Sequence, residues 1–307
     1  MNAMSILLNV RYWILAAIVI GFIVGDIGGE NDALLIIIFL MIMMCFSLTK
    51  MKFVKDDLAH YRKHVLLAIL LCSFVATLIT LGVGLFYPKE MWNGWVILAC
   101  VPCAISVVSG TMFMKGDSKM IMISLSVIYI LAIVLTPLFS YLIMGNAIDP
   151  MEIVKYILLF VVIPILVSLP LRKANIPDNI NTIIINFTFS MFALIAIGRG
   201  RDFFFDDFGL ALSVIAASAV RIALAHLVFE YTMRHFGMSR GDRIPFSLLL
   251  IWRNSGLALA MVLLLFPDNN MALAPASISM IFEQFYLMFM MWYYERIVPA
   301  ETAEVDI

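Results

Sequence analysis

The chain has 307 residues, of which 64% are apolar or aromatic and 13% are charged, and its mean hydropathy is +1.04. A soluble domain is roughly half apolar and about a quarter charged, so this composition excludes an ordinary water-soluble globular protein. A formal net charge of −1 gives no electrostatic basis for binding nucleic acid, and we expect the lipid bilayer to surround the chain.

Apolar stretches long enough to cross a membrane recur along the whole chain. A bilayer core of about 30 Å needs about 20 mostly apolar residues per helix. By this measure the sequence predicts ten transmembrane helices, over 11–26, 33–48, 64–87, 92–114, 120–144, 151–171, 180–197, 209–233, 245–266 and 271–294. The predicted fold class is therefore an all-α polytopic membrane protein.

Positive charge is distributed unevenly between alternate loops. Lys and Arg are enriched in loops that stay in the cytoplasm. Fourteen of the 20 Lys and Arg residues fall in one set of loops, and the other set holds Lys89, Lys155, Arg199 and Arg201. This bias predicts a multi-pass protein of the cytoplasmic (plasma) membrane with both termini in the cytoplasm.

The ten helices divide into two sets of five near Gly145–Pro150. Because five is odd, the second set starts on the opposite side of the membrane from the first. Two halves that share a fold are then inverted repeats, an arrangement common in transporters. The predicted repeats are residues 1–147 and 148–307.

The fourth helix of each half contains residues that interrupt helices near mid-membrane. In the first half they lie in Val101–Thr111, which includes Pro102 and Gly110, and in the second half they lie in Trp252–Gly256. Freed backbone groups at this depth must be satisfied by protein or by a wet cavity. We therefore expect two broken helices; two kinked packing helices are the alternative.

These two stretches resemble the bile acid:sodium symporter family and its relatives. The likeness is carried by PCAISVVSGTMFMKGD at 102–117 and by NSGLA at 254–258. It implies a panel domain of about 11–48 and 151–197, a core domain of the other six helices, and a small organic anion carried by alternating access. The substrate-binding residues it implies at the crossing of the two broken helices are Pro102, Cys103, Ser106, Ser109, Gly110, Arg253, Asn254, Ser255 and Gly256.

The sequence departs from the family at the positions expected to bind sodium. Aligned without gaps, Val107 and Val108 stand where the family has a hydroxyl and an amide, Leu249 stands at a carboxylate, and Arg253 stands at an amide. These side chains supply none of the expected oxygen ligands. We therefore predict no cofactor, with sodium the one coupling ion that the resemblance leaves open.

Arg253 is an arginine predicted near mid-membrane, where its permanent charge needs a partner or water. One hypothesis is that it is a tethered cation that stands where sodium would bind and attracts the substrate through a bidentate contact. The alternative is an internal salt bridge with Glu283. The two can coexist if the substrate carboxylate competes with Glu283.

Other intramembrane polar residues are candidates for coupling or pairing. His226 and Glu230 are four residues apart on one helix face, which fits a proton relay or an interfacial pair. Neither has the further ligands of a metal site, so no metal is predicted. The full set of coupling or pairing candidates is Ser73, Ser126, Glu283 and His226.

The four cysteines, Cys45, Cys72, Cys100 and Cys103, all lie in apolar runs, which favours buried packing residues over disulfides. Related arsenite-efflux permeases also carry a cysteine directly after a proline in the fourth helix, so metalloid efflux through Cys103 is an alternative function. Without an H-E-x-x-H or serine-elbow motif, an enzyme is not predicted. The sequence does not predict an oligomeric state.

Overall fold

The computed structural model describes residues 4, 7–27, 29–49, 57–145, 149–267 and 269–296. Lys50, Lys52 and Lys55, which counted toward the predicted orientation, lie outside these residues, as does the predicted repeat boundary at 147/148. The described chain is helical throughout, with one isolated β-bridge. The all-α prediction is confirmed.

The first half of the chain contains five helical segments in the described residues. The third segment includes a π-helical stretch, η2, and the fourth is divided into α7 and α8. The bounds are α2 Val10–Val24, α3 Asp32–Leu48, α5 Arg62–Ile69 with η2 Leu70–Val75 and α6 Ala76–Gly84, α7 Lys89–Cys100 with α8 Val107–Phe113, and α9 Ser118–Met144.

The second half likewise contains five helical segments in the described residues. Its third segment also has a π-helical stretch, η5, and its fourth is divided into α15 and α16. The bounds are α10 Pro150–Ile157 with η4 Leu158–Val162 and α11 Ile163–Lys173, α12 Asp178–Asp206, α13 Phe208–Ala219 with η5 Val220–Leu224 and α14 Ala225–His235, α15 Arg240–Ile251 with α16 Ser255–Leu265, and η6 Asn270–Leu273 with α17 Ala274–Arg296.

Local sequence explains where several helices begin. The Asp117 carboxylate accepts hydrogen bonds from two backbone N–H groups of the first turn of α9. Asp149 caps α10 in the same way, with Pro150 as the first helical residue. One boundary prediction is wrong: α12 continues to Asp206, so Arg199 and Arg201 lie in this helix and not in a loop.

Six of the helices in the described residues are long and apolar enough to cross a membrane. The stretches Tyr12–Val24, Leu34–Leu48 and Ser255–Leu265 are apolar but shorter than 18 residues. The chain is therefore a multi-pass membrane protein. The two broken segments are not counted among the six because neither forms one continuous helix.

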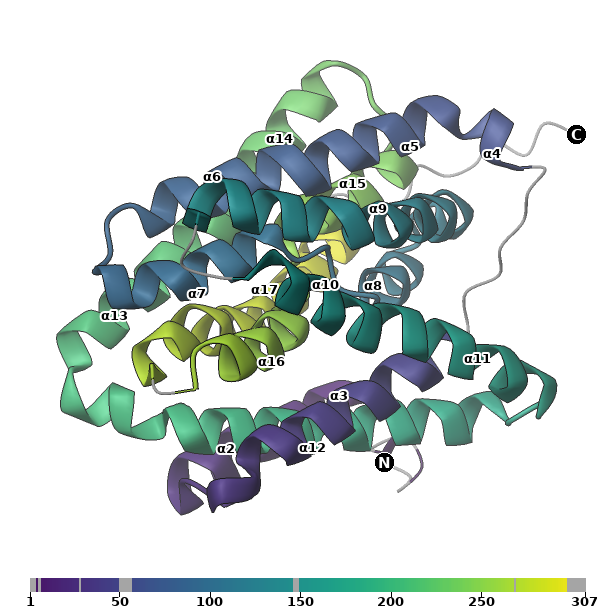
Figure 1. Cartoon of the computed structure of the whole chain (residues 1–307). Coiled ribbons are helices and arrows are strands. Elements are labelled where there is room, and N and C mark those ends of the chain that lie inside the picture. The colour runs from purple at the N-terminus through teal and green to yellow at the C-terminus, as the bar shows by residue number, and fades with distance from the viewer. Residues whose placement is uncertain are drawn as a thin grey trace, which may run out of the picture.

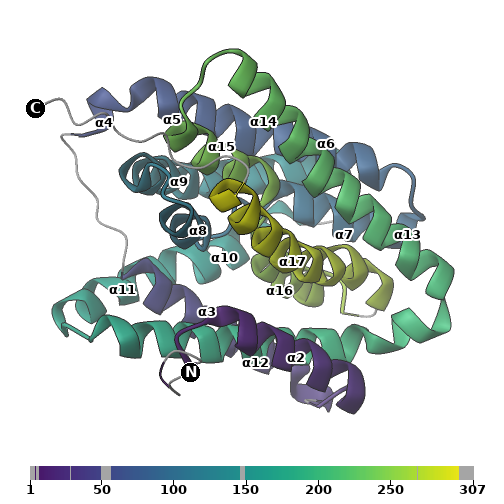
Figure 2. The same cartoon turned by 180° about the vertical axis from the view of Figure 1, so that it is seen from behind.

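The helices form two groups that lie against one another (Figures 1 and 2). In the first group α12 packs along both α2 and α3, and α3 also packs on α11. The second group places α7, α16 and α17 at its centre, between α12 on one side and α5, α6 and α14 on the other. The broken segments are thus enclosed by continuous helices.

Two glycines mark places where backbone approaches backbone. A Cβ at Gly94 in α7 would overlap the carbonyl oxygen of Ala272 in η6, and a Cβ at Gly198 in α12 would overlap the carbonyl oxygen of Gly25. In contrast, a Cβ at Gly82 in α6 would meet no atom within 4 Å. Helix α7 therefore depends on the small size of Gly94 for its close packing.

We predict that Gly94→Ala destabilises the protein by about 1–3 kcal/mol, because the backbone of η6 must move away from the added methyl group. The control Gly82→Ala should leave stability unchanged or raise it by up to about 1 kcal/mol, since alanine favours the helix and meets no neighbour. Thermal unfolding of both variants in detergent measures the difference. Equal melting temperatures for the two variants would contradict the close approach.

Candidate functional site

Both predicted helix breaks are present. Helix α7 ends at Cys100, Val101 is extended, and α8 begins only at Val107. Helix α15 ends at Ile251, Trp252 is extended, and α16 begins at Ser255. Pro102 cannot donate a backbone hydrogen bond, which explains the first break. At the second, the Asn254 side chain accepts from the Leu257 N–H and so caps the new helix.

The two breaks meet and satisfy part of each other's backbone. Cys103 and Arg253 form an isolated antiparallel β-bridge. The Ala104 N–H donates to the Trp252 carbonyl at 3.2 Å, and the Asn254 N–H donates to the Pro102 carbonyl at 2.9 Å. The two broken helices therefore cross at an isolated β-bridge.

Side chains from α9 bind further carbonyls around this crossing. The Tyr129 hydroxyl donates to the Cys103 carbonyl at 3.1 Å and accepts from the Asn254 amide at 3.1 Å. Thr136 donates to the Cys100 carbonyl at 2.9 Å. Sequence reasoning missed both residues, since nothing in a single sequence marks which face of α9 meets the break.

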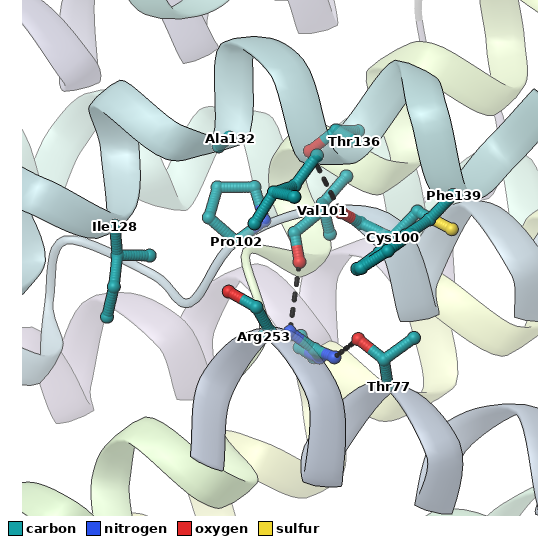
Figure 3. Close-up of a pocket in the computed structure, with 11 residues that line it drawn as sticks. Thr77, Cys100, Val101, Pro102, Ile128, Ala132, Thr136, Phe139 and Arg253 are labelled. Carbon is teal, nitrogen blue, oxygen red and sulfur yellow. Dashed lines mark hydrogen bonds between the residues drawn. The ribbon is translucent and has the colours of Figure 1, made fainter. Parts of the chain in front are cut away.

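The Arg253 guanidinium occupies a cage of oxygen atoms at the end of α7, and its side chain is only 1% exposed. Figure 3 shows it pointing toward Val101 and Thr77. Nη1 donates to the carbonyls of Cys72 at 2.8 Å and Val101 at 3.1 Å, and Nη2 donates to the Thr77 hydroxyl at 2.7 Å and the Ala99 carbonyl at 2.8 Å. We call these four oxygen-bearing residues, Cys72, Thr77, Ala99 and Val101, the first cage.

The first cage leaves little of the guanidinium for a solute. Both terminal nitrogens of Arg253 have two partners each, and only Nε has none. A bidentate contact between Arg253 and a carboxylate would require the cage to open. In the described geometry Arg253 therefore stabilises the broken helix with its hydrogen bonds, and its terminal nitrogens are not free to bind an anion.

The alternative pairing of Arg253 with Glu283 is wrong. The Glu283 carboxylate instead forms an ion pair with Arg221 at 2.7 Å, and both side chains are 2% exposed. Its second oxygen accepts from the Ser255 hydroxyl at 2.9 Å, and Arg221 also donates to the Ile251 carbonyl at 3.1 Å. Sequence alone could not decide which of two intramembrane arginines would reach Glu283.

These contacts leave one buried positive charge without a carboxylate. In the described part of the chain, the ion pairs join His64 to Asp242, Arg221 to Glu283, and Arg243 to Glu230, and none includes Arg253. Oxygen atoms and the Cys72 sulfur, which lies 3.9 Å from Nη1, surround Arg253. With cysteines counted as neutral thiols, the formal side-chain charges at the crossing sum to one positive unit.

His226 and Glu230 lie in a separate polar cluster between α14 and α17. The His226 Nε2 lies 3.3 Å from the Tyr294 hydroxyl, which donates to Glu230 at 2.7 Å. Arg243 pairs with the same carboxylate at 3.0 Å. The predicted shared face is therefore observed, with Tyr294 joining the two residues, and the pairing interpretation of Glu230 is the one that the geometry favours.

The remaining predicted residues differ in burial and in the atoms that they contact. Pro102, Cys103, Gly110, Asn254, Ser255 and Gly256 are buried at the crossing. Ser106 and Ser109 are exposed, while Val107 and Val108 beside them are buried. Ser126 bonds the Met122 carbonyl of its own helix, Ser73 lines a crevice beside Arg253, and Leu249 is fully buried.

The crevice that borders Arg253 lies between Ser73, Pro102, Ile128 and Phe139 and has room for about one water molecule. A second crevice beside Glu283 and Tyr286 is smaller still. Among the residues that the structure describes, no three His, Cys, Asp or Glu side chains are grouped to hold a metal ion. Neither crevice accommodates an organic solute in this conformation.

We predict that Arg253→Met destabilises the protein by at least about 2 kcal/mol, since it removes the arginine donor from the Cys72 and Val101 carbonyls and from the Thr77 hydroxyl. The Ala99 carbonyl keeps the Thr77 hydroxyl as a donor. The control is Arg234→Met, because Arg234 is exposed on α14; we expect its stability to change by less than about 0.5 kcal/mol. Unfolding in mixed detergent micelles measures both. A variant Arg253→Met as stable as the unmodified protein would show that the cage does not hold the break.

The sequence comparisons agree with this architecture. A family model described as the sodium bile acid symporter family matches residues 37–198, more than half of the chain. The matched region contains the first break but ends before the second, so Arg221, Arg253 and Glu283 lie outside it. No curated protein matches the chain. The chain belongs to the sodium bile acid symporter family, and it is a membrane transporter and not an enzyme.

Proposed function

We propose that the protein is a secondary carrier that moves a small organic anion across the cytoplasmic membrane by alternating access, with both termini in the cytoplasm. The observation that carries this proposal is the meeting of two broken helices around a buried, uncompensated arginine. Broken helices that cross near mid-membrane are the usual place for a solute in such carriers.

The arrangement of helices supports ten membrane spans in two inverted repeats, 1–147 and 148–307. The third segment of each half contains a π-helical stretch, η2 or η5, and the fourth segment of each half is broken. Paired irregularities at equivalent positions are expected when two repeats share one fold. A third π-helical stretch, η4 in the first segment of the second half, has no counterpart in α2.

The net positive charge at the crossing supports an anionic substrate. A charge buried in a membrane protein costs several kcal/mol unless an opposite charge approaches it. An anion that enters beside Arg253 supplies that opposite charge, whereas a cation would raise the cost. The exposed hydroxyls of Ser106 and Ser109, at the start of α8, would add hydrogen-bond donors for it.

Packing around the crossing supports two moving parts, the panel of about 11–48 and 151–197 and the core of the other helices. Gly256, the second residue of α16, lies against Leu40 of α3 and Phe192 of α12, both fully buried. Helix α8, on the other side of the crossing, keeps Met112 and Phe113 more than half exposed. A rocking motion of the panel against the core would open the contact at Gly256 and cover the exposed part of α8.

Arg253 supports a carrier that does not need sodium in the first cage. Carbonyls at the ends of unwound helices are typical sodium ligands, and here the guanidinium already holds three of them. The guanidinium group leaves no room for a sodium ion among these carbonyls. The alternative of metalloid efflux through Cys103 has no support from the family match and is included in the test below.

We expect proteoliposomes with the purified protein to take up an organic anion from a panel of a bile acid, a monocarboxylate and a dicarboxylate. Uptake should be the same in sodium and in choline buffers, because the first cage is already filled. Arsenite serves as the comparison substrate for the alternative. Uptake of arsenite alone, lost in Cys103→Ser, would replace the anion proposal, and sodium-dependent anion uptake would refute the tethered cation.

We also predict that Ser106→Trp lowers uptake of the transported anion at least tenfold without lowering the melting temperature, since an exposed indole would obstruct the crossing. Ser213→Trp is the matched control, because Ser213 is exposed on α13 away from the crossing. Uptake rates and melting temperatures of the two variants distinguish obstruction from misfolding. Unchanged uptake by Ser106→Trp would place the solute elsewhere.

A further inference from the structure

Arg221 fills a second group of oxygen atoms, at the end of α15. Its Nη1 donates to the Ile251 carbonyl at 3.1 Å and its Nη2 donates to a Glu283 oxygen at 2.7 Å. The other Glu283 oxygen accepts from Ser255 at the start of α16. We call Ile251, Ser255 and Glu283 the second cage. Arg221 contacts Ile251 and Glu283 directly, Ser255 joins the cage through Glu283, and all three are buried.

The two cages occupy equivalent places in the two halves. The first lies where α7 ends and includes the Cys72 carbonyl from η2. The second lies where α15 ends, and its arginine comes from η5. Each cage therefore combines the end of a broken helix with the π-helical stretch of the preceding segment, and each is filled by a guanidinium.

The two cages differ in charge, and the charge of a cage determines whether it can bind a cation. The first cage contains three carbonyls and one hydroxyl, with no carboxylate. The second contains a carboxylate, a carbonyl and a hydroxyl, and the carbonyl lies at the negative end of the α15 dipole. Only the second cage has the full negative charge that a bound monovalent cation needs when it is buried.

We propose that the second cage is a sodium-binding site that the Arg221 guanidinium occupies permanently, so that removal of this side chain creates a functional sodium site. This inference rests on the proposed function, since it assigns a cation-binding position beside the second break of the carrier to a side chain of the protein itself. Loss of the guanidinium leaves Glu283 buried and unpaired, and sodium restores the charge balance with the same oxygen ligands.

The test compares melting temperatures of purified Arg221→Ala in sodium chloride and in choline chloride at equal ionic strength. Sodium at ten times its dissociation constant should raise the melting temperature of this variant by about 3 °C or more, because a ligand that binds only the folded state stabilises it. The unmodified protein should show no difference between the two salts. Arg221→Gln, which keeps more of the side-chain volume, should show the same response as Arg221→Ala.

Two controls identify the second cage as the source of the response. Arg221→Ala with Glu283→Gln should show no sodium response, since the carboxylate is gone. Arg243→Ala also leaves a buried carboxylate unpaired, that of Glu230, but at no helix break; it should show no response either. An equal response in Arg243→Ala would mean that any unpaired buried carboxylate takes up sodium, and the cage would have no special role.

The proposal is overturned if both single variants at Arg221 melt identically in the two salts, or if neither can be recovered in sodium. The readout does not depend on transport, so it is independent of the proposed function. A sodium response without anion uptake by the unmodified protein would retain the cage and refute the carrier. Anion uptake by the unmodified protein, without a sodium response in the Arg221 variants, would retain the carrier and refute the cage.

Discussion

The structure depends on how the carbonyl groups freed by two helix breaks are satisfied inside a membrane. An unpaired carbonyl in hydrocarbon costs several kcal/mol, and α7 and α15 both end at buried residues. In this chain the donors include the guanidinium groups of Arg253 and Arg221, the hydroxyls of Tyr129 and Thr136, and the backbone N–H groups beside the β-bridge between the breaks. The same groups that allow the breaks to exist therefore also set the charge of the site.

That charge connects packing with transport. Arg221 is neutralised by Glu283, whereas the described ion pairs include no carboxylate for Arg253. The remaining positive unit favours an anion at the crossing, and the filled cages leave no obvious ligands for a coupling ion. A carrier with no sodium ion in either cage would have to move its solute down its own gradient, exchange it for another anion, or couple it to protons. Sodium coupling within the family would then depend on which residues form the cages and not on the fold.

Hydropathy and helix-breaking residues predicted most of the fold. The all-helical fold class, the breaks at Pro102 and at Trp252–Asn254, and a buried Arg253 all follow from local composition, and the described residues contain them. The count of ten spans and the inverted repeats stay predictions. The partner of Glu283 was predicted wrongly because pairing depends on which helix faces meet, and a single sequence does not encode that in any local pattern. The π-helical stretches and the roles of Thr77, Tyr129 and Thr136 were missed for the same reason. Single-residue insertions into a helix leave hydropathy almost unchanged.

The central claim is that guanidinium groups occupy both cages and leave none of their oxygen atoms free for a mobile cation. Direct binding of radioactive sodium to the purified, unmodified protein tests it, by scintillation proximity with choline as the competing salt. The account predicts no saturable sodium binding at physiological concentrations. Saturable binding of one or two sodium ions per chain would contradict it, since those ions would need ligands that the guanidinium groups already hold.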